Sequence, residues 1–134
     1  MPNVTPEQLM QKAMEVRAKA HCPYSKFHVG AALLTESGEI FTGCNVENAS
    51  YPCGICAERT AITKAVSEGH QKFVAIAVIS DAEDVVTPCG ICRQTMREFS
   101  KDLKVYCAKR DGSYETHTLA ELLPHSFGPE NLKS

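Results

Sequence analysis

Two pairs of cysteines with the spacing Cys-x-x-Cys are the residues of this sequence best suited to bind a metal ion. The first pair is Cys53 and Cys56, and the second pair, Cys89 and Cys92, directly follows Pro88. Thiolates at this spacing bind zinc in closed structural sites with four protein ligands. They also bind it in catalytic sites, where three protein ligands leave one position open. The spacing alone does not distinguish between the two kinds of site.

The residue types around the first pair favour the catalytic site. Glu58 follows Cys56 by two residues, where its carboxylate can move protons next to a metal. Structural zinc modules are mostly small folds that need the metal to fold, whereas 134 residues are enough to bury a core. We therefore predict that Cys56, Cys89 and Cys92 bind one zinc ion and that Cys53 is not a ligand. A closed site with four cysteines is the alternative, in which Glu58 only stabilises a helix N-terminus.

The charge of this predicted site needs compensation. Three thiolates around Zn²⁺ make the site formally negative, which opposes the acidification of water that catalytic zinc provides. Two helix N-termini and a guanidinium, from Arg59 or Arg93, are the candidates to offset that charge.

The cysteines outside the two pairs, Cys22, Cys44 and Cys107, are expected to be small buried residues. The five histidines lie outside the metal-binding spacing, so we expect them at the surface or hydrogen-bonded in the core.

The elements that must position these residues follow from hydrophobic periodicity and turn signals. A helix is predicted from a Thr5 cap to the break at Pro23, and a hairpin from two strands at 27–34 and 39–46. A helix at 56–68, a buried strand at 73–79, a helix at about 89–99 and a strand at 103–108 follow. A short strand and a helical turn at 119–123 complete the chain. This order predicts an α/β fold, a three-layer α/β/α sandwich around a mixed sheet whose middle strands are parallel and joined by right-handed crossovers.

Composition limits the classes of function. The absence of repeats and linkers predicts one domain over residues 1–134. The 14 basic and 16 acidic residues give a net charge of −2 without any basic cluster, which disfavours a nucleic-acid partner. No apolar run reaches the roughly 20 residues of a membrane span. The first residues lack the layout of a signal peptide, so we expect a cytoplasmic protein, with access to the nucleus left open by its small size.

Several blocks of sequence resemble the small homotetrameric cytidine deaminases, in that family's order and over nearly the whole chain. They are CPYSKF at 22–27, VGAA at 29–32, GCNVENASYP at 43–52, CAERTA at 56–61 and PCGICRQ at 88–94. The resemblance implies that family's mixed five-stranded sheet and one Zn²⁺ per subunit. It implies hydrolysis of cytidine and 2′-deoxycytidine to uridine and 2′-deoxyuridine with release of ammonia, in pyrimidine salvage. A zinc-activated water would attack C4, with Glu58 as proton shuttle.

The resemblance also implies how the nucleoside substrate is recognised. Phe27 would pack on the pyrimidine ring, and Asn45 and Glu47 would hydrogen-bond the ribose 3′-hydroxyl. The backbone of Ala57 and the side chain of Glu58 would bind the amide edge of the ring. Without the resemblance, Phe27 is better interpreted as a core aromatic, and Asn45 and Glu47 as one solvated face of a strand.

Two residues would act across a subunit boundary of the implied homotetramer. Tyr51 and Phe127 resemble residues that complete a neighbouring site, and Arg59 resembles the cation that hydrogen-bonds the thiolates. Cys53 departs from the family, where an apolar residue is common.

The remaining alternatives are a non-catalytic zinc module, a polynucleotide-editing deaminase and a nucleoside-antibiotic deaminase. The Asn-Val-Glu-Asn block at 45–48 and the lack of a basic cluster favour the free nucleoside.

Overall fold

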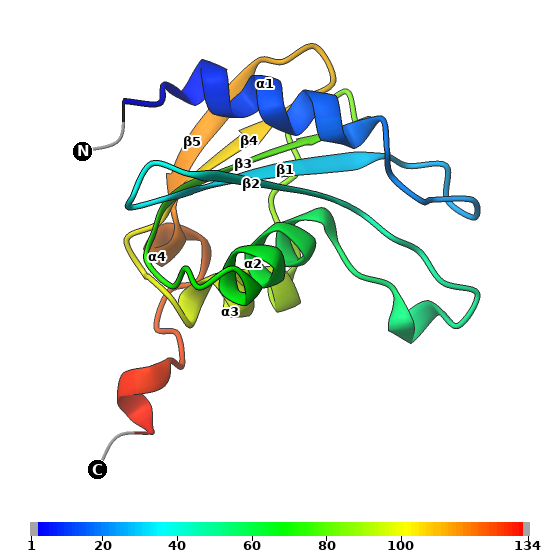
Figure 1. Cartoon of the computed structure of the whole chain (residues 1–134). Coiled ribbons are helices and arrows are strands. Elements are labelled where there is room, and N and C mark those ends of the chain that lie inside the picture. Colours follow the sequence, from blue (N-terminus) through cyan, green and yellow to red (C-terminus); the bar gives the residue numbers. More distant parts are fainter. Residues whose placement is uncertain (1–2, 133–134) are drawn as a thin grey trace.

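A mixed five-stranded sheet forms the middle layer of the molecule, whose computed structural model describes residues 3–132. The sheet has the order β2-β1-β3-β4-β5 (Figure 1). Its strands are β1 (Val29–Thr35), β2 (Ile40–Cys44), β3 (Phe73–Ser80), β4 (Lys104–Ala108) and β5 (Tyr114–Thr118). Strand β1 pairs antiparallel with β2 and β3, β3 pairs parallel with β4, and β4 pairs antiparallel with β5.

The middle strands are parallel, as predicted, and the strand order shows which of them are neighbours in the sheet. Because β1 is antiparallel to both β2 and β3, strands β2, β3 and β4 run the same way. The first half of the sheet differs from a simple parallel array, since β1 lies between β2 and β3. Strand β2 ends at Cys44, two residues earlier than predicted, so Asn45 and Glu47 lie beyond the strand and not on its face.

Helices cover both faces of the sheet, as predicted for a three-layer sandwich (Figure 1). Helix α1 (Pro6–Arg17) begins at the predicted Thr5 cap, where Thr5 and Gln8 form a capping box. It packs Leu9 and Ala13 against one face of β1 and β3. The opposite face carries α2 (Ala57–Ser67), α3 (Gly90–Arg97) and the short α4 (Leu119–Leu122), which share the second hydrophobic cluster. Among helices of residues 3–132, none combines the length and apolarity needed to cross a membrane.

Helix α2 lies directly against the backbone of β2. A Cβ atom at Gly43 would stand 2.5 Å from the Ala61 nitrogen and 2.6 Å from the Ala57 oxygen. Both are backbone atoms within the helix, so a side chain could not be accommodated by a rotamer change. Glycine at this position therefore fixes the height of the first turn of α2, and with it Cys56 and Glu58, above the sheet.

Candidate active site

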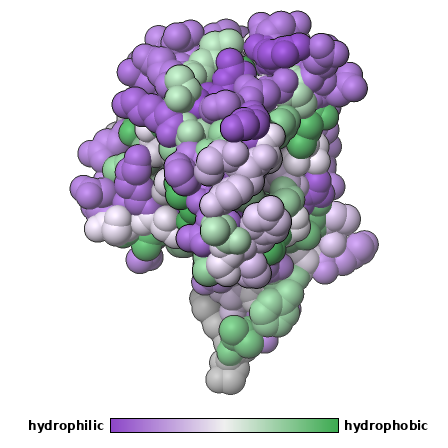
Figure 2. Space-filling model, turned by 90° about the vertical axis from the view of Figure 1, so that its right-hand side faces the viewer, coloured by the Kyte–Doolittle hydropathy of each residue, from purple (hydrophilic) through white to green (hydrophobic). Residues whose placement is uncertain are grey.

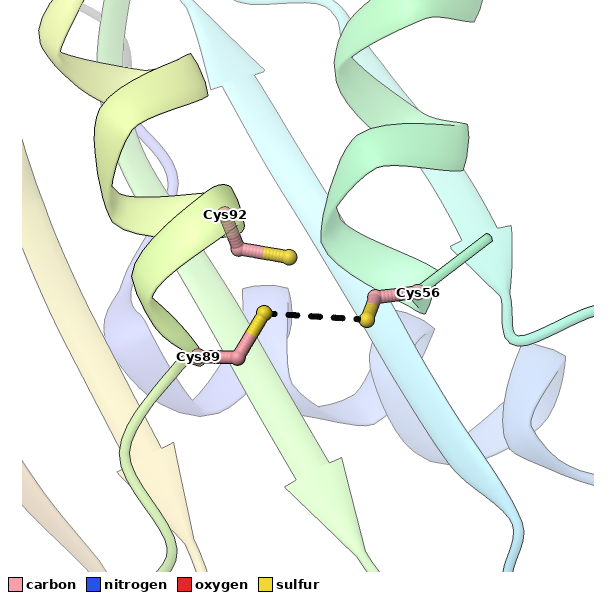
Figure 3. Close-up of side chains that lie close together, drawn as sticks. All are labelled: Cys56, Cys89 and Cys92. Carbon is pink, nitrogen blue, oxygen red and sulfur yellow. Dashed lines mark hydrogen bonds between the residues drawn. The ribbon is translucent and has the colours of Figure 1, made fainter. Parts of the chain in front are cut away.

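The N-termini of α2 and α3 bring the three predicted zinc ligands together. Cys56 is the N-cap residue of α2, Cys89 is the N-cap residue of α3, and Cys92 lies in the first turn of α3. Their Sγ atoms all lie within 4.8 Å of one another. Figure 3 shows the three sulfur atoms pointing toward a common centre from the two helices.

The donor set fits zinc. Tetrahedral coordination with Zn–S bonds of about 2.3 Å places sulfur atoms about 3.8 Å apart, and the Sγ atoms of Cys56 and Cys89 are 3.9 Å apart. Cys92 is buried, whereas Cys89 is exposed, so one side of the group faces solvent. Cys53 is exposed and lies outside the group of thiols. This arrangement leaves a fourth position open and disfavours the closed four-cysteine alternative.

One guanidinium and one helix N-terminus lie at the sulfur of Cys56. The Nη2 atom of Arg59 donates a hydrogen bond to Cys56 Sγ at 3.6 Å, and the α2 N-terminus places its positive end at the same atom. Hydrogen bonds with Cys92 and then Arg59 lower the pKa of the Cys56 thiol to about 5. A thiolate that is ready to bind a metal is therefore present at neutral pH.

Of the two candidate arginines, Arg93 does not contact the sulfur atoms. Its guanidinium donates to the Pro88 oxygen at 2.7 Å and to the Leu122 oxygen and Thr87 Oγ1, both at 2.6 Å. Of the two arginines predicted as alternatives, Arg59 is therefore the one that hydrogen-bonds a thiol. Arg93 instead fixes the turn that leads into Cys89, because it bridges the loop before α3 and the end of α4.

Glu58 lies in the first turn of α2 with its side chain only 5% exposed. It lines the same cavity as Cys56 and Cys89. Burial raises the pKa of Glu58 to about 7. A buried carboxyl with a pKa near neutrality is suited to take up and return a proton during a reaction.

The cavity in front of the thiols has a volume of about 490 Å³, within the range of small-molecule sites. Its wall contains the predicted residues Phe27, Asn45, Glu47 and Ala57. The Phe27 side chain is 38% exposed, so the core position that its sequence context alone favoured is wrong. Further cavity-lining residues that sequence reasoning missed are Ser25, Val29, Val78, Ser80, Val86, Thr87. The position of Ser80 at the carboxyl end of a buried strand was the available signal, since ligands often bind there.

Asn45 holds the backbone that carries Phe27. Its Oδ1 atom accepts from the Val29 nitrogen and its Nδ2 atom donates to the Phe27 oxygen, both at 2.8 Å. On the other side of this segment, the Asp81 carboxylate accepts from the His28 nitrogen at 2.8 Å. Residues 27–29 are therefore fixed from two directions, and one N–H of the Asn45 amide remains for a ligand.

Glu47 is held by the loop before β1. Its Oε1 atom accepts from the backbone nitrogens of Tyr24 and Ser25 at 3.1 and 3.2 Å, and its Oε2 atom accepts from the Ser25 hydroxyl. The hydrogen bond from Ser25 is the main cause that lowers the pKa of Glu47. The cavity wall thus presents an ionised carboxylate in a fixed orientation.

Tyr51 and Phe127 lie outside this cavity. Tyr51, in the short 3₁₀ helix η1 (Tyr51–Cys53), is 75% exposed and its ring lies 6.0 Å from that of Tyr24. Phe127 is 58% exposed, and its carbonyl accepts from Gln94. Hydrophobic side chains gather at the narrow lower end of the molecule in Figure 2, where the C-terminal segment lies. Within one chain, neither aromatic reaches the thiols.

The other cysteines differ in burial. Cys22 and Cys107 are buried, as predicted, but Cys44 is only half-buried. All seven cysteines are free thiols.

Replacing Cys53 with serine is expected to leave the zinc content at about one ion per chain, because Cys53 lies outside the ligand group. Metal analysis of the purified variant by atomic emission checks this. Cys44→Ser, which changes another thiol outside the group, is the matched control. Loss of zinc from Cys53→Ser alone would restore the four-cysteine interpretation.

A buried glutamate next to three thiols at two helix N-termini is the arrangement that zinc-dependent deaminases of nucleobases use to activate water. Residues 4–109 match the family model described as "Cytidine and deoxycytidylate deaminase zinc-binding region". The chain belongs to this family, and it is an enzyme of the cytidine deaminase type with a zinc cofactor.

Individual relatives support the assignment over most of the chain. A cytidine deaminase of Sporosarcina psychrophila is 49% identical over 127 residues, which cover 94% of this chain and 93% of the relative. A probable cytidine deaminase of Dictyostelium discoideum is 53% identical, with 94% and 86% covered. The crystal structure of cytidine deaminase from Burkholderia pseudomallei aligns with a TM-score of 0.89 at 44% identity, covering 92% of this chain and all of that chain.

Proposed function

We propose that this chain, as one deaminase domain, hydrolyses cytidine and 2′-deoxycytidine to uridine and 2′-deoxyuridine with release of ammonia, a reaction of pyrimidine salvage. The observation that carries the proposal is the buried Glu58 beside the thiols of Cys56, Cys89 and Cys92, at a cavity of nucleoside size. The names of the relatives agree with cytidine as a substrate.

The reaction needs a nucleophile at C4 and two proton transfers. Zinc bound by Cys56, Cys89 and Cys92 would supply an activated water. The Glu58 carboxylate takes a proton from the attacking water and delivers it to N3 of the ring, while the water oxygen bonds to C4. Glu58 then takes the remaining hydroxyl proton and passes it to the amino group. The C4–N bond breaks, ammonia leaves and a carbonyl remains at C4.

The cavity wall provides the groups for nucleoside recognition. Phe27 packs on the pyrimidine ring, and the Ala57 backbone with the Glu58 carboxyl binds the amide edge. Glu47, and the free N–H of Asn45, hydrogen-bond the ribose 3′-hydroxyl. The fixed Glu47 carboxylate supports this role, since it is already oriented by three donors.

The charge of the wall favours a free nucleoside over a polynucleotide. Within the described chain, the residues lining the cavity include the carboxylates of Glu47 and Glu58, and no lysine or arginine. Single-stranded nucleic acid is bound through basic grooves that follow its phosphates.

We further propose a homotetramer in which Tyr51 and Phe127 contact the site of a neighbouring subunit. Both aromatics stand exposed on this chain, where an interface would bury them. A reducing compartment such as the cytoplasm fits the seven free thiols.

Ultraviolet absorbance of cytidine incubated with the purified protein tests the function, together with metal analysis of the same sample. Conversion to uridine with about one zinc ion per chain supports the proposal. Zinc binding without conversion contradicts it.

Truncating the ring-packing aromatic should weaken substrate binding. Phe27→Ala is expected to raise KM for cytidine by about tenfold or more, because stacking of a base on an aromatic side chain contributes about 1–3 kcal/mol. Zinc content should not change, since Phe27 lies outside the ligand group. Steady-state kinetics with Tyr114→Ala as control checks this, because Tyr114 is an aromatic of β5 away from the cavity. An equal change of KM in both variants would show that Phe27 has no specific role in substrate binding.

A further inference from the structure

The hydroxyl of Ser25 connects two parts of the cavity wall. It donates to Glu47 Oε2 and accepts from the Phe27 nitrogen at 3.0 Å. The Ser25 nitrogen also donates to Glu47 Oε1 at 3.2 Å. One side chain therefore contacts both the carboxylate assigned to the ribose and the residue assigned to the base.

The backbone between Ser25 and Phe27 is strained. Lys26 has a φ of +62°, in the left-handed region that non-glycine residues adopt only where neighbouring contacts hold them there. The Lys26 nitrogen donates to the Cys22 oxygen at 3.0 Å, which closes the turn from its N-terminal side. On the C-terminal side, the Ser25 hydroxyl is the group that bonds the Phe27 nitrogen.

Three hydrogen bonds therefore hold the backbone that carries the Phe27 ring. Asn45 holds the Phe27 oxygen, Asp81 holds the nitrogen of His28, and Ser25 holds the nitrogen of Phe27. Only the Ser25 anchor also contacts Glu47, so it is the point at which the base and ribose parts of the wall are joined.

We propose that Ser25 is a positioning residue for nucleoside binding, which sets the orientation of the Glu47 carboxylate and the Phe27 backbone at the same time. The inference rests on the proposed function, because it takes the cavity as the nucleoside site. Ser25 acts through these two residues and not on the reacting atoms. Its removal should therefore affect substrate binding and leave the zinc centre and the chemical step in place.

The test compares Ser25→Ala with Ser25→Thr, which keeps the hydroxyl, in the zinc-loaded enzyme. Ser25→Ala is expected to raise KM for cytidine by about tenfold, as for loss of a hydrogen bond to a charged group, with kcat changed by less than about twofold. In Ser25→Thr, KM should return close to the value of the parent enzyme. Ser113→Ala is the matched control, because the Ser113 hydroxyl donates to Asp111 at 2.7 Å in an exposed turn away from the cavity.

A double-mutant cycle shows whether Ser25 acts through Glu47. In a Glu47→Ala background, the effect of Ser25→Ala on KM should shrink to less than about threefold. Equal effects in the two backgrounds would overturn the coupling. So would a fall in kcat without a change in KM, or a loss that threonine does not restore.

Hydrogen exchange separates this inference from the proposed function. The Phe27 amide proton should exchange about tenfold faster in Ser25→Ala than in the parent enzyme, because its acceptor is gone. If the parent enzyme fails to deaminate cytidine, the proposed function fails, whereas the exchange rate still decides the role of Ser25. An unchanged exchange rate at Phe27 would overturn the inference even in a fully active enzyme.

Discussion

Glu58→Gln is expected to lower kcat for cytidine by about a thousandfold while the zinc content stays at about one ion per chain. Glutamine keeps the shape of the side chain but cannot accept a proton from water or hand it to the ring. The first turn of α2 places the Glu58 carboxyl at the cavity, beside the thiols of Cys56 and Cys92. The other carboxylate among the cavity-lining residues is that of Glu47, which hydrogen bonds already hold to the loop before β1.

Glu68→Gln is the control for this variant, because Glu68 is the C-cap residue at the far end of the same helix. Steady-state kinetics and metal analysis of both variants give the result. If Glu58→Gln keeps more than about a tenth of the parent kcat, Glu58 does not carry the proton-transfer steps. Retained zinc in that variant excludes an indirect effect through the metal.

Cys92→Ala is expected to abolish both zinc binding and turnover, because only two thiol ligands would remain. The protein should also lose the stability that the metal provides. A ligand present at a thousandfold above its Kd stabilises the folded state by about 4 kcal/mol. A chelator should therefore lower the Tm of the parent enzyme and leave the Tm of Cys92→Ala unchanged. Thermal unfolding of both proteins with and without the chelator measures this.

Cys107→Ala provides a matched control, since Cys92 and Cys107 are both fully buried and only Cys92 belongs to the thiol group. It should keep zinc, keep turnover and respond to the chelator as the parent does. A Cys92→Ala protein that retains one zinc ion per chain would contradict the three-thiol site.

Sequence reasoning identified the features that depend on nearby residues. The Thr5 cap, the two helix N-termini and the spacing of Cys89 and Cys92 are local patterns, and each lies where it was predicted. The alternation of strands and helices was likewise enough to predict a mixed sheet covered on both faces, because both faces of a buried sheet must be covered.

The contacts that complete the cavity could not be obtained in this way. Arg93 bonds Leu122, 29 residues away, and Asn45 bonds Val29, 16 residues away. Such partners depend on which strands are neighbours, and the insertion of β1 between β2 and β3 is a property of the whole sheet. Ser25 belongs to the CPYSKF block at 22–27, but the sequence assigned it no role, because a serine in a loop is compatible with many local roles.

The path of the chain between the thiols has a consequence for how the enzyme acquires its metal. Cys56 and Cys89 are 33 residues apart in sequence, and strand β3 between them occupies the centre of the sheet. During synthesis, Cys56 leaves the ribosome well before its partners. The three sulfur atoms meet in the folded chain, where β3 pairs with β1 and α3 lies beside α2, and an unfolded chain offers no such site. Zinc binding by all three thiols therefore depends on a correctly formed sheet, and a chain that misfolds around β3 would lack the complete site.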